Sequence, residues 1–195
     1  MTMKSICVYC GSSPGRNPSY ARAAQNLGRE LALRGIRLVY GGASVGIMGT
    51  VADAVLQHGG QVVGVIPESL KRKEVAHLHL TELHVTSSMH ARKMMMADLS
   101  DGFIALPGGI GTLEEISEIW TWAQLGLHRK AFGLLNVEGY YDPLIAFLDH
   151  TVAEGFVKLQ HRSMLLVDEN PVDLLDRLAL YVPPDVEKWI DRSET

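Results

Sequence analysis

Short apolar runs alternate along the chain with longer stretches whose apolar residues recur at helical spacing. Seven runs predict buried strands, at residues 6–9, 37–40, 61–66, 83–85, 103–106, 131–135 and 165–167. Nearly continuous apolar strands separated by helices are typical of a parallel sheet that is covered on both faces. The pattern therefore predicts a single doubly wound, Rossmann-like α/β domain with a mostly parallel sheet of about seven strands.

The first helix is predicted over residues 18–34. Pro18 is favoured at the opening of a helix, and Gly35 is favoured just past its end. One face of this helix carries Ala21, Ala24, Leu27 and Leu31. The 195 residues contain no linker or repeat, so we expect one domain over residues 1–182 and a loosely attached C-terminal tail over 183–195.

Three glycine-rich loops follow the first, second and fifth predicted strands, at residues 11–15, 41–49 and 107–112. Each loop alone is most simply a tight turn, because glycine is the usual turn residue. Together they fall at the carboxyl ends of parallel strands, where such sheets bind ligands, and so predict a phosphate or nucleotide site. The dinucleotide spacing G-x-G-x-x-G after the first strand and the P-loop spacing are both missing, so neither standard site is supported.

The third loop is the candidate for an anion site and contains the candidate catalytic residue. Residues 107–115 read Pro-Gly-Gly-Ile-Gly-Thr-Leu-Glu-Glu and lie between a buried strand and a helical stretch over 113–126. Backbone N–H groups of such a loop, with the positive end of the helix dipole, bind anions. Thr112 and Glu115 also have the T-x-x-E spacing of a capping box, so Glu115 has a structural alternative to a catalytic role. Glu114 lies about 100° round the helix and is expected to face solvent or a neighbouring element.

Composition narrows the possible partners. The chain is 47% hydrophobic and 21% charged, with a net charge of −4, so no overall basic field attracts a nucleic acid polymer or an anionic membrane. No apolar run reaches spanning length and no leader is recognisable, which predicts a cytoplasmic protein.

Two groups of residues could suggest a metal or redox site. Cys7 and Cys10 have C-x-x-C spacing, but strand alternation sends them to opposite faces, and no second pair completes a zinc site. His77, His79 and His84 lack an accompanying H-E-x-x-H motif or cysteine set, so surface histidines are expected. We therefore predict no metal and no redox role.

Arg92 and Lys93 lie near the start of another predicted helix. In isolation such a pair is most often a solvated basic surface, although two adjacent cations could bind a phosphate or ribose hydroxyls.

The run at 107–115 resembles the PGGxGTxxE motif of the Lonely Guy (LOG) family, the cytokinin riboside 5′-monophosphate phosphoribohydrolases that are often labelled lysine decarboxylases. The similarity extends from Cys10-Gly11-Ser12 through Tyr40-Gly41-Gly42 and Val65-Ile66-Pro67 to residues 121–126 and 133–141. The resemblance implies that Arg92 and Glu115 are catalytic. It implies substrate contacts at Glu74, Arg92, Lys93, Gly109, Ile110, Gly111, Thr112, Leu113, Glu114, Glu115 and Thr121.

The implied reaction is hydrolysis of the N-glycosidic bond of an N6-modified adenosine 5′-monophosphate, without metal or cofactor. Positive charge develops on the ribose as the base leaves, and a carboxylate stabilises that charge or activates water. Three alternatives stay open: a broader purine nucleotide nucleosidase, a nonenzymatic nucleotide-binding module, and a pyridoxal-phosphate decarboxylase, for which Lys93 is the one lysine within the proposed site. The preferred base and the division of roles between Arg92 and Lys93 are left open.

The resemblance also implies a homodimer, since LOG proteins of similar length are dimers. The helix over 113–126 carries large apolar residues near helical spacing and is the expected contact, through Ile116, Ile119, Trp120, Ala123 and Leu127.

Overall fold

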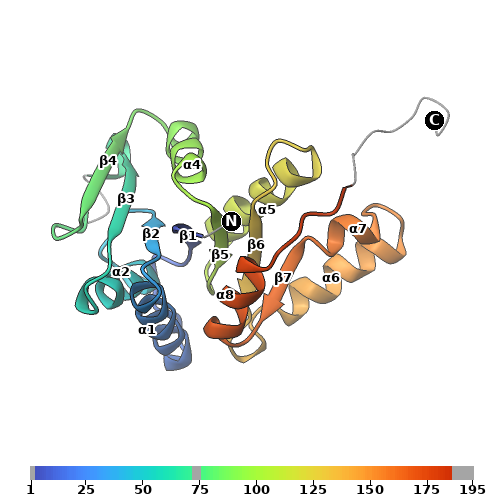
Figure 1. Ribbon diagram of the computed structural model, residues 1–195, viewed down its shortest axis with the longest axis horizontal. Helices are drawn as coiled ribbons and strands as arrows, with labels where there is room; N and C mark the ends of the chain where they lie inside the picture. Colours follow the sequence, from blue (N-terminus) through green and yellow to red (C-terminus); the bar gives the residue numbers. More distant parts are fainter. Residues whose placement is uncertain (1–2, 72–75, 186–195) are drawn as a thin grey trace.

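The computed structural model describes residues 3–71 and 76–185. Its centre is a seven-stranded, wholly parallel sheet in the order β4-β3-β2-β1-β5-β6-β7 (Figure 1). All seven predicted strands are confirmed, and their ends move by no more than one residue. They are β1 Ser5–Tyr9, β2 Arg37–Tyr40, β3 Val62–Pro67, β4 Glu82–Thr86, β5 Gly102–Ala105, β6 Ala131–Leu135 and β7 Leu165–Asp168.

Helices cover both faces of the sheet, as expected of a doubly wound domain. One face packs against α1, α2 and α8, and the other against α4, α5 and the segment that includes α6 and α7 (Figure 1). The helices are α1 Pro18–Leu33, α2 Gly46–Gln57, α3 Glu68–Lys71, α4 Met89–Asp98, α5 Ile110–Gln124, α6 Asp142–Ala153, α7 Leu159–Arg162 and α8 Pro171–Ala179, with a 3₁₀ turn η1 at Val137–Gly139.

Strand β1 shows how the sequence divides the core into two layers. Ile6 and Val8 lie in the cluster with α1, α2 and α8, and Cys7 and Tyr9 lie in the cluster with α4 and α5. Cys10 lies three residues after Cys7 and belongs to the cluster with α1, α2 and α8. The two thiols are therefore on opposite faces of the sheet, as predicted. Both are free and buried, and burial raises the pKa of each thiol well above its usual value.

The order of the strands indicates where a ligand binds, at the carboxyl ends of the strands. The chain moves outward from β1 through β2, β3 and β4, and then returns to the other side of β1 with β5, β6 and β7. Ligands bind where this direction reverses, outside the carboxyl ends of the strands. There the Gly11 N–H donates to Pro107 O at 3.2 Å, and Gly11 O accepts from Ile47 N at 3.1 Å. The three glycine-rich loops therefore meet at one edge, as the sequence predicts.

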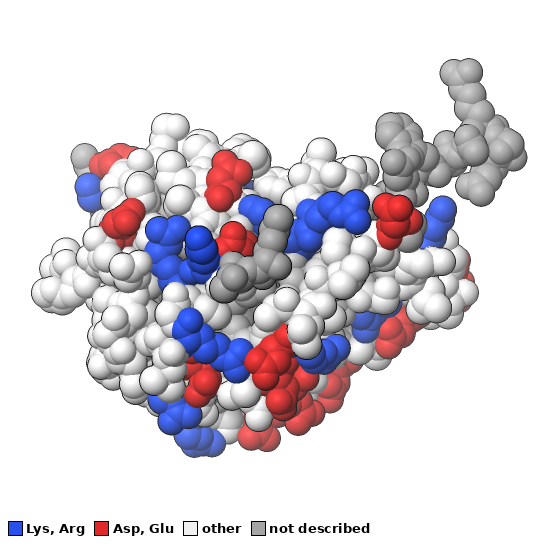
Figure 2. All heavy atoms as spheres, in the orientation of Figure 1, with Lys and Arg blue, Asp and Glu red and all other residues white. Residues whose placement is uncertain are grey.

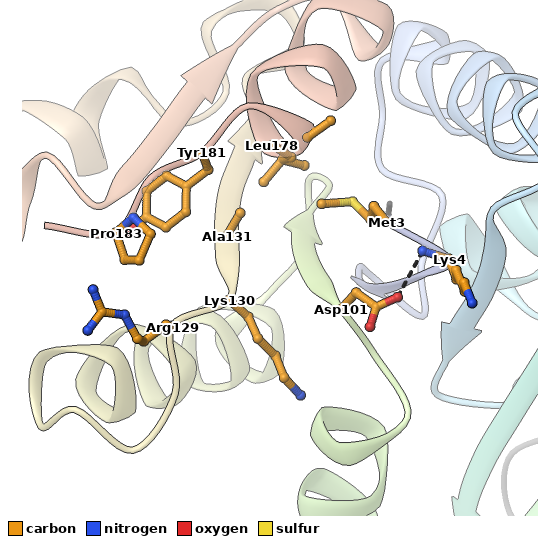
Figure 3. A pocket seen from close by; sticks show the side chains of 10 residues that line it. Met3, Lys4, Asp101, Arg129, Lys130, Ala131, Leu178, Tyr181 and Pro183 are labelled. Carbon is orange, nitrogen blue, oxygen red and sulfur yellow. Dashed lines mark hydrogen bonds between the residues drawn. The ribbon is translucent and has the colours of Figure 1, made fainter. Parts of the chain in front are cut away.

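The opposite edge of the sheet holds a pocket of about 820 Å³, lined among others by Met3, Lys4, Asp101, Arg129 and Tyr181 (Figure 3). Asp101, Lys130 and Arg129 each contact a partner within the protein. Asp101 Oδ2 accepts from the backbone N–H groups of Lys4, at 2.8 Å, and Ser5, at 3.0 Å. The Lys130 ammonium donates to Ala97 O at 2.8 Å, and Arg129 lies 3.7 Å from an Asp185 carboxylate oxygen.

Basic and acidic side chains are interspersed on the face of the molecule seen in Figure 2. No helix among residues 3–71 and 76–185 combines the length and apolar character needed to cross a bilayer. The predicted boundary at residue 183 stays a prediction, and residues 186–195 of the predicted tail lie outside the described residues.

Candidate active site

The glycine loop after β5 leads into α5 earlier than the sequence suggests. The helix begins at Ile110 with Gly109 as its N-cap, and not near residue 113. Thr112 is thus inside the first turn, buried, with its hydroxyl packed against Gly108, where any Cβ would collide with it. The capping box, which was the structural alternative for Glu115, is therefore wrong, because Thr112 does not occupy the N-cap position that a capping box requires.

The start of α5 suits an anion. The first N–H groups of a helix have no acceptor within the helix, and Gly109 supplies no side-chain cap. The space where a side chain would stand is open at Gly109 and Gly111, so a ligand can approach the backbone there. A phosphate would meet these N–H groups at the positive end of the helix dipole.

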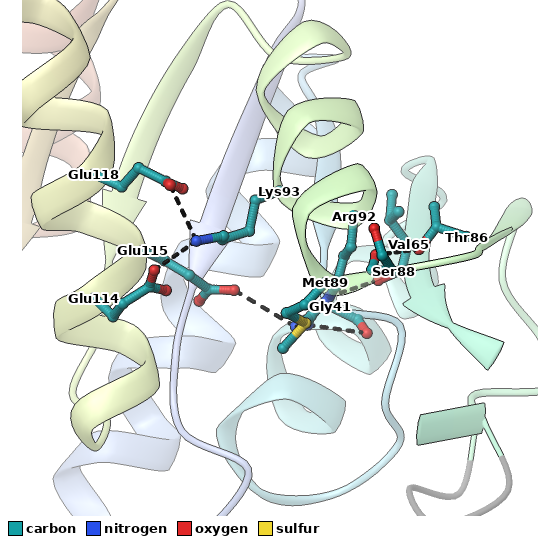
Figure 4. A network of polar contacts seen from close by, with 10 residues as sticks. All are labelled: Gly41, Val65, Thr86, Ser88, Met89, Arg92, Lys93, Glu114, Glu115 and Glu118. Carbon is teal, nitrogen blue, oxygen red and sulfur yellow. Dashed lines mark hydrogen bonds and ion pairs between the residues drawn. The ribbon is translucent and has the colours of Figure 1, made fainter. Parts of the chain in front are cut away.

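Glu115 lies one turn into α5 and points toward Arg92 of α4 (Figure 4). Its Oε1 lies 3.6 Å from Arg92 Nη1, and only 13% of its side chain is exposed. Burial raises the pKa of Glu115 to about 7, against the lowering effect of the Arg92 cation. A carboxyl group that changes charge near neutral pH, inside the ligand edge of an α/β sheet, is typical of a catalytic group.

Arg92 is fixed by the ends of two strands. Its Nε donates to Val65 O at 3.0 Å and its Nη2 donates to Gly41 O at 3.4 Å. The Arg92 guanidinium occupies the space that a side chain at Gly41 would need. The second glycine loop thus makes room for a buried cation beside Glu115.

Lys93 points away from Arg92 although the two are adjacent in α4 (Figure 4). Its ammonium lies 2.5 Å from Glu114 Oε1 and 3.1 Å from Glu118 Oε1. Burial lowers the pKa of Lys93, but the hydrogen bonds to the two glutamates outweigh it, and the pKa is raised. Glu114, expected to face solvent or a neighbouring element, does both, since its side chain is half exposed and it pairs with Lys93 of α4. Glu118 was missed, although its spacing of four from Glu114 on a helix indicates a shared face.

The remaining predicted substrate contacts differ in how close they lie to the Arg92–Glu115 pair. Thr121 lies six residues beyond Glu115 on α5, exposed, with its hydroxyl donating to Ser117 O at 2.8 Å, so the structure does not bring it to the Arg92–Glu115 pair. Leu113 is partly buried against the core. Ile110, the first residue of α5, is 81% exposed. Glu74 lies outside the described residues.

The helix face expected to contact a second copy is largely occupied within the chain. Ile116, Ile119 and Trp120 are buried against the sheet, and Trp120 Nε1 donates to His161 O at 2.9 Å. The assignment of these three residues to a dimer contact is therefore wrong. Leu127, just beyond α5, is 69% exposed and remains accessible.

The histidines expected at the surface are not all exposed. His77 is buried, and its Nε2 lies 2.9 Å from Asp53 Oδ1. No group of three or more metal-binding side chains is found among residues 3–71 and 76–185.

Comparison with known proteins identifies relatives. A family model described as "Possible lysine decarboxylase" matches residues 48–178. The cytokinin riboside 5′-monophosphate phosphoribohydrolase LOG of Oryza sativa subsp. japonica is 52% identical over 180 residues, which cover 92% of this chain and 74% of the relative. The cytokinin riboside 5′-monophosphate phosphoribohydrolase of Rhodococcoides fascians is 53% identical over 167 residues, covering 85% and 84%.

Solved structures show the same fold at low identity. The molybdenum cofactor binding protein of Rippkaea orientalis superposes with a TM-score of 0.68 at 23% identity, covering 90% of this chain and 95% of that one. This likeness supports the Rossmann-like architecture and carries no statement about the ligand.

Proposed function

Because the chain belongs to the LOG family, whose model is described as possible lysine decarboxylases, we propose that it hydrolyses the N-glycosidic bond of N6-modified adenosine 5′-monophosphates. The products are the free base, a cytokinin, and ribose 5-phosphate. The buried Arg92–Glu115 pair beside the open glycine loop is the observation that carries the proposal.

The phosphate occupies the loop at the start of α5 in this proposal. The N–H groups of the first turn hold the 5′-phosphate, and this binding energy orients the ribose against α4 and α5. The predicted contacts at Gly109, Ile110 and Gly111 fit this role through their backbones. The contacts predicted at Glu74 and Thr121 stay predictions.

Glu115 and Arg92 then act on the sugar. The C1′–N9 bond breaks with its electron pair leaving on the base, and the oxygen of water bonds to C1′. One proton of that water ends on the departing base, so the products are neutral free base and ribose 5-phosphate. Ionised Glu115 stabilises the positive ribose or takes the proton of the attacking water. Arg92, held by two carbonyls, keeps the carboxylate charged and oriented.

The position of Lys93 weakens the decarboxylase alternative. A Schiff-base lysine needs a neutral amine, which a raised pKa opposes. Its ammonium is also occupied by two carboxylates. The geometry therefore supports a hydrolase in preference to pyridoxal chemistry.

The phosphate dependence tests the proposal. N6-isopentenyl-AMP, AMP and their nucleosides are incubated with the protein, and free base and ribose 5-phosphate are measured. Loss of two or three charge-assisted hydrogen bonds costs about 3–6 kcal/mol, so a nucleoside should react with kcat/KM roughly a hundredfold lower or more.

Each other outcome assigns a different function. Equal cleavage of nucleoside and nucleotide would remove the phosphate from catalysis. Reaction of AMP alone would replace the cytokinin assignment with a broader nucleosidase. Binding of nucleotide without any released base would make the protein a nonenzymatic nucleotide-binding module.

We also propose a homodimer, whose contact uses apolar side chains that the chain leaves exposed. Leu127 is 69% exposed, and on and beyond α6 Phe147 and Phe156 are 60% and 86% exposed. Light scattering at micromolar concentration should give the mass of two chains, and a monomer there would reject the proposal. The cytoplasmic location stays a prediction.

A further inference from the structure

The ion pairs between α4 and α5 form a small cluster around the proposed catalytic pair (Figure 4). Among residues 3–71 and 76–185 the salt bridges that join these helices are Arg92 to Glu115 and Lys93 to Glu114 and Glu118. Glu114 and Glu118 stand one helical turn apart and flank Glu115 in sequence. Lys93 therefore joins the helix that carries Arg92 to the helix that carries Glu115.

The Lys93 ammonium is suited to this link. Its side chain is 10% exposed, so the two ion pairs are shielded from solvent on the lysine side. They engage two of the three N–H donors of the ammonium. A ligand contact would compete with two carboxylates that already bind it.

The charges facing Glu115 come from three elements. Arg92 and Lys93 face it from α4, and Glu114 and Glu118 from its own helix. From β1 and the residue that follows, Cys7, Tyr9 and Cys10 interact with it, and burial raises the pKa of each of these groups, so they are uncharged at neutral pH. The balance around Glu115 is therefore between two cations and two carboxylates.

We propose that Lys93 is a positioning residue, whose ammonium ties α4 to α5 through Glu114 and Glu118 and thereby holds Arg92 against Glu115 and neutralises the two neighbouring carboxylates. This inference rests on the proposed function, because it gives Lys93 a task in that site. It differs from the substrate contact that the resemblance implies for Lys93.

Lys93→Met removes the charge and keeps the length of the side chain. Glu114 and Glu118 then act on Glu115 without compensation, so the acid limb of kcat/KM should move upward by roughly one pH unit. The substrate phosphate is the same for both proteins, so its own ionisation does not contribute to the difference. At neutral pH kcat should fall about tenfold and KM should change by less than about threefold.

Removing the two negative charges that pair with Lys93 gives the comparison to Lys93→Met, which removes the positive charge. Glu114→Gln with Glu118→Gln leaves Lys93 uncompensated and should move the acid limb downward. Combining both changes with Lys93→Met should return the limb toward the wild-type position. Lys93→Arg, which keeps the charge, should keep the acid limb near its wild-type position. Lys158→Met, at the exposed start of α7, is the matched control for loss of a lysine.

A direct ligand contact predicts another result. Lys93→Met would then raise KM about tenfold or more with the acid limb unmoved, and removal of both glutamates would not reverse it. That outcome would overturn the proposal. If Lys93→Met does not fold, Lys93→Gln takes its place in every comparison, with the same results expected and the same result overturning the proposal.

A measurement without turnover separates this inference from the proposed function. Titration of the Glu115 side-chain carboxyl by ¹³C NMR follows its ionisation in each protein. A wild-type protein that releases no base from any nucleotide would refute the function, and the titration would still test Lys93. An unchanged Glu115 titration in Lys93→Met would refute the positioning role even if the enzyme were active.

Discussion

The two ends of the parallel sheet carry similar side chains in opposite settings. At the amino end, the pocket bounded by Lys4, Asp101 and Arg129 is large, and Arg129 is 66% exposed with an exposed partner. At the carboxyl end, Arg92 is 5% exposed and its guanidinium contacts two carbonyls and the buried Glu115. The contrast between the ends is one of desolvation rather than of residue type.

This difference indicates where chemistry is possible. Exposed ion pairs contribute little free energy, because solvent screens them and holding two long side chains in place costs entropy. Burial raises the pKa of Glu115 to about 7, which means that its ionised form is disfavoured in the free protein. A positive charge that develops on the substrate in the transition state stabilises this ionised form. The size of the amino-end pocket is therefore a weaker indication of activity than the low exposure of Arg92 and Glu115.

The largest effect is expected from Glu115→Gln, which keeps the shape of the side chain and removes its charge. Turnover should fall by a factor on the order of a thousand or more, because the developing positive charge on the ribose loses its counter-charge. Nucleotide affinity, measured by calorimetry, should stay within about tenfold. Unchanged turnover would restrict Glu115 to a structural role and remove the distinction between the two ends.

The stability of the same variant should depend on pH. The folded-state pKa of Glu115 is above the unfolded value of 4.5, so the wild-type stability due to the protonated carboxyl is fully present below about pH 4.5 and is lost as pH rises through about 7. The loss is on the order of 3 kcal/mol, and Glu115→Gln does not suffer it. Melting temperatures should favour the variant more at about pH 8 than at about pH 5.

Glu169→Gln is the control for the pH dependence expected of Glu115→Gln. Glu169→Gln alters an exposed carboxylate after β7, so its difference from wild type should be the same at both pH values. If Glu115→Gln behaved like Glu169→Gln, burial would not govern Glu115, and the comparison between the two ends would fail.

Much of the fold followed from local patterns, because strands buried on both faces leave continuous apolar runs that need no tertiary knowledge to recognise. The meeting of the three glycine loops followed from the topology rule for parallel sheets. The start of α5 did not follow. Gly109 and Gly111 suggested a turn, whereas the helix already includes Gly111, since tertiary packing of Thr112 against Gly108 overrides the low helix propensity of glycine.

The charges of the site were less predictable. Spacing showed that Arg92 and Lys93 are adjacent, but their directions depend on α4 lying between β3 and α5. The pairing of Lys93 with Glu118 joins residues 25 apart in sequence, which no local pattern reveals. Trp120 was expected to face a partner, yet it packs against Phe132 within the chain, because an amphipathic face alone does not say whether sheet or partner covers it.

Gly41→Ala tests how the strand ends hold Arg92. The added methyl group would collide with the guanidinium, so Arg92 must move from Glu115, and kcat/KM should fall roughly 10- to 100-fold. In protein that already carries Arg92→Ala, Gly41→Ala should have little further effect, which a double-mutant cycle measures. Additive losses would show that Gly41 acts on the ligand or the loop and not through Arg92.

The smallest effect is expected at the amino end. Arg129→Ala removes an exposed cation from the amino-end pocket, in which Asp101 and Lys130 keep their partners within the protein. Because no step of the proposed reaction uses this end of the sheet, kcat and KM should each stay within about twofold of wild type, and exposed pairs of this kind change stability by about 1 kcal/mol or less. A tenfold change in KM for the nucleotide would mean that the ligand reaches the amino end, and the assignment of the site to the carboxyl end would have to be abandoned.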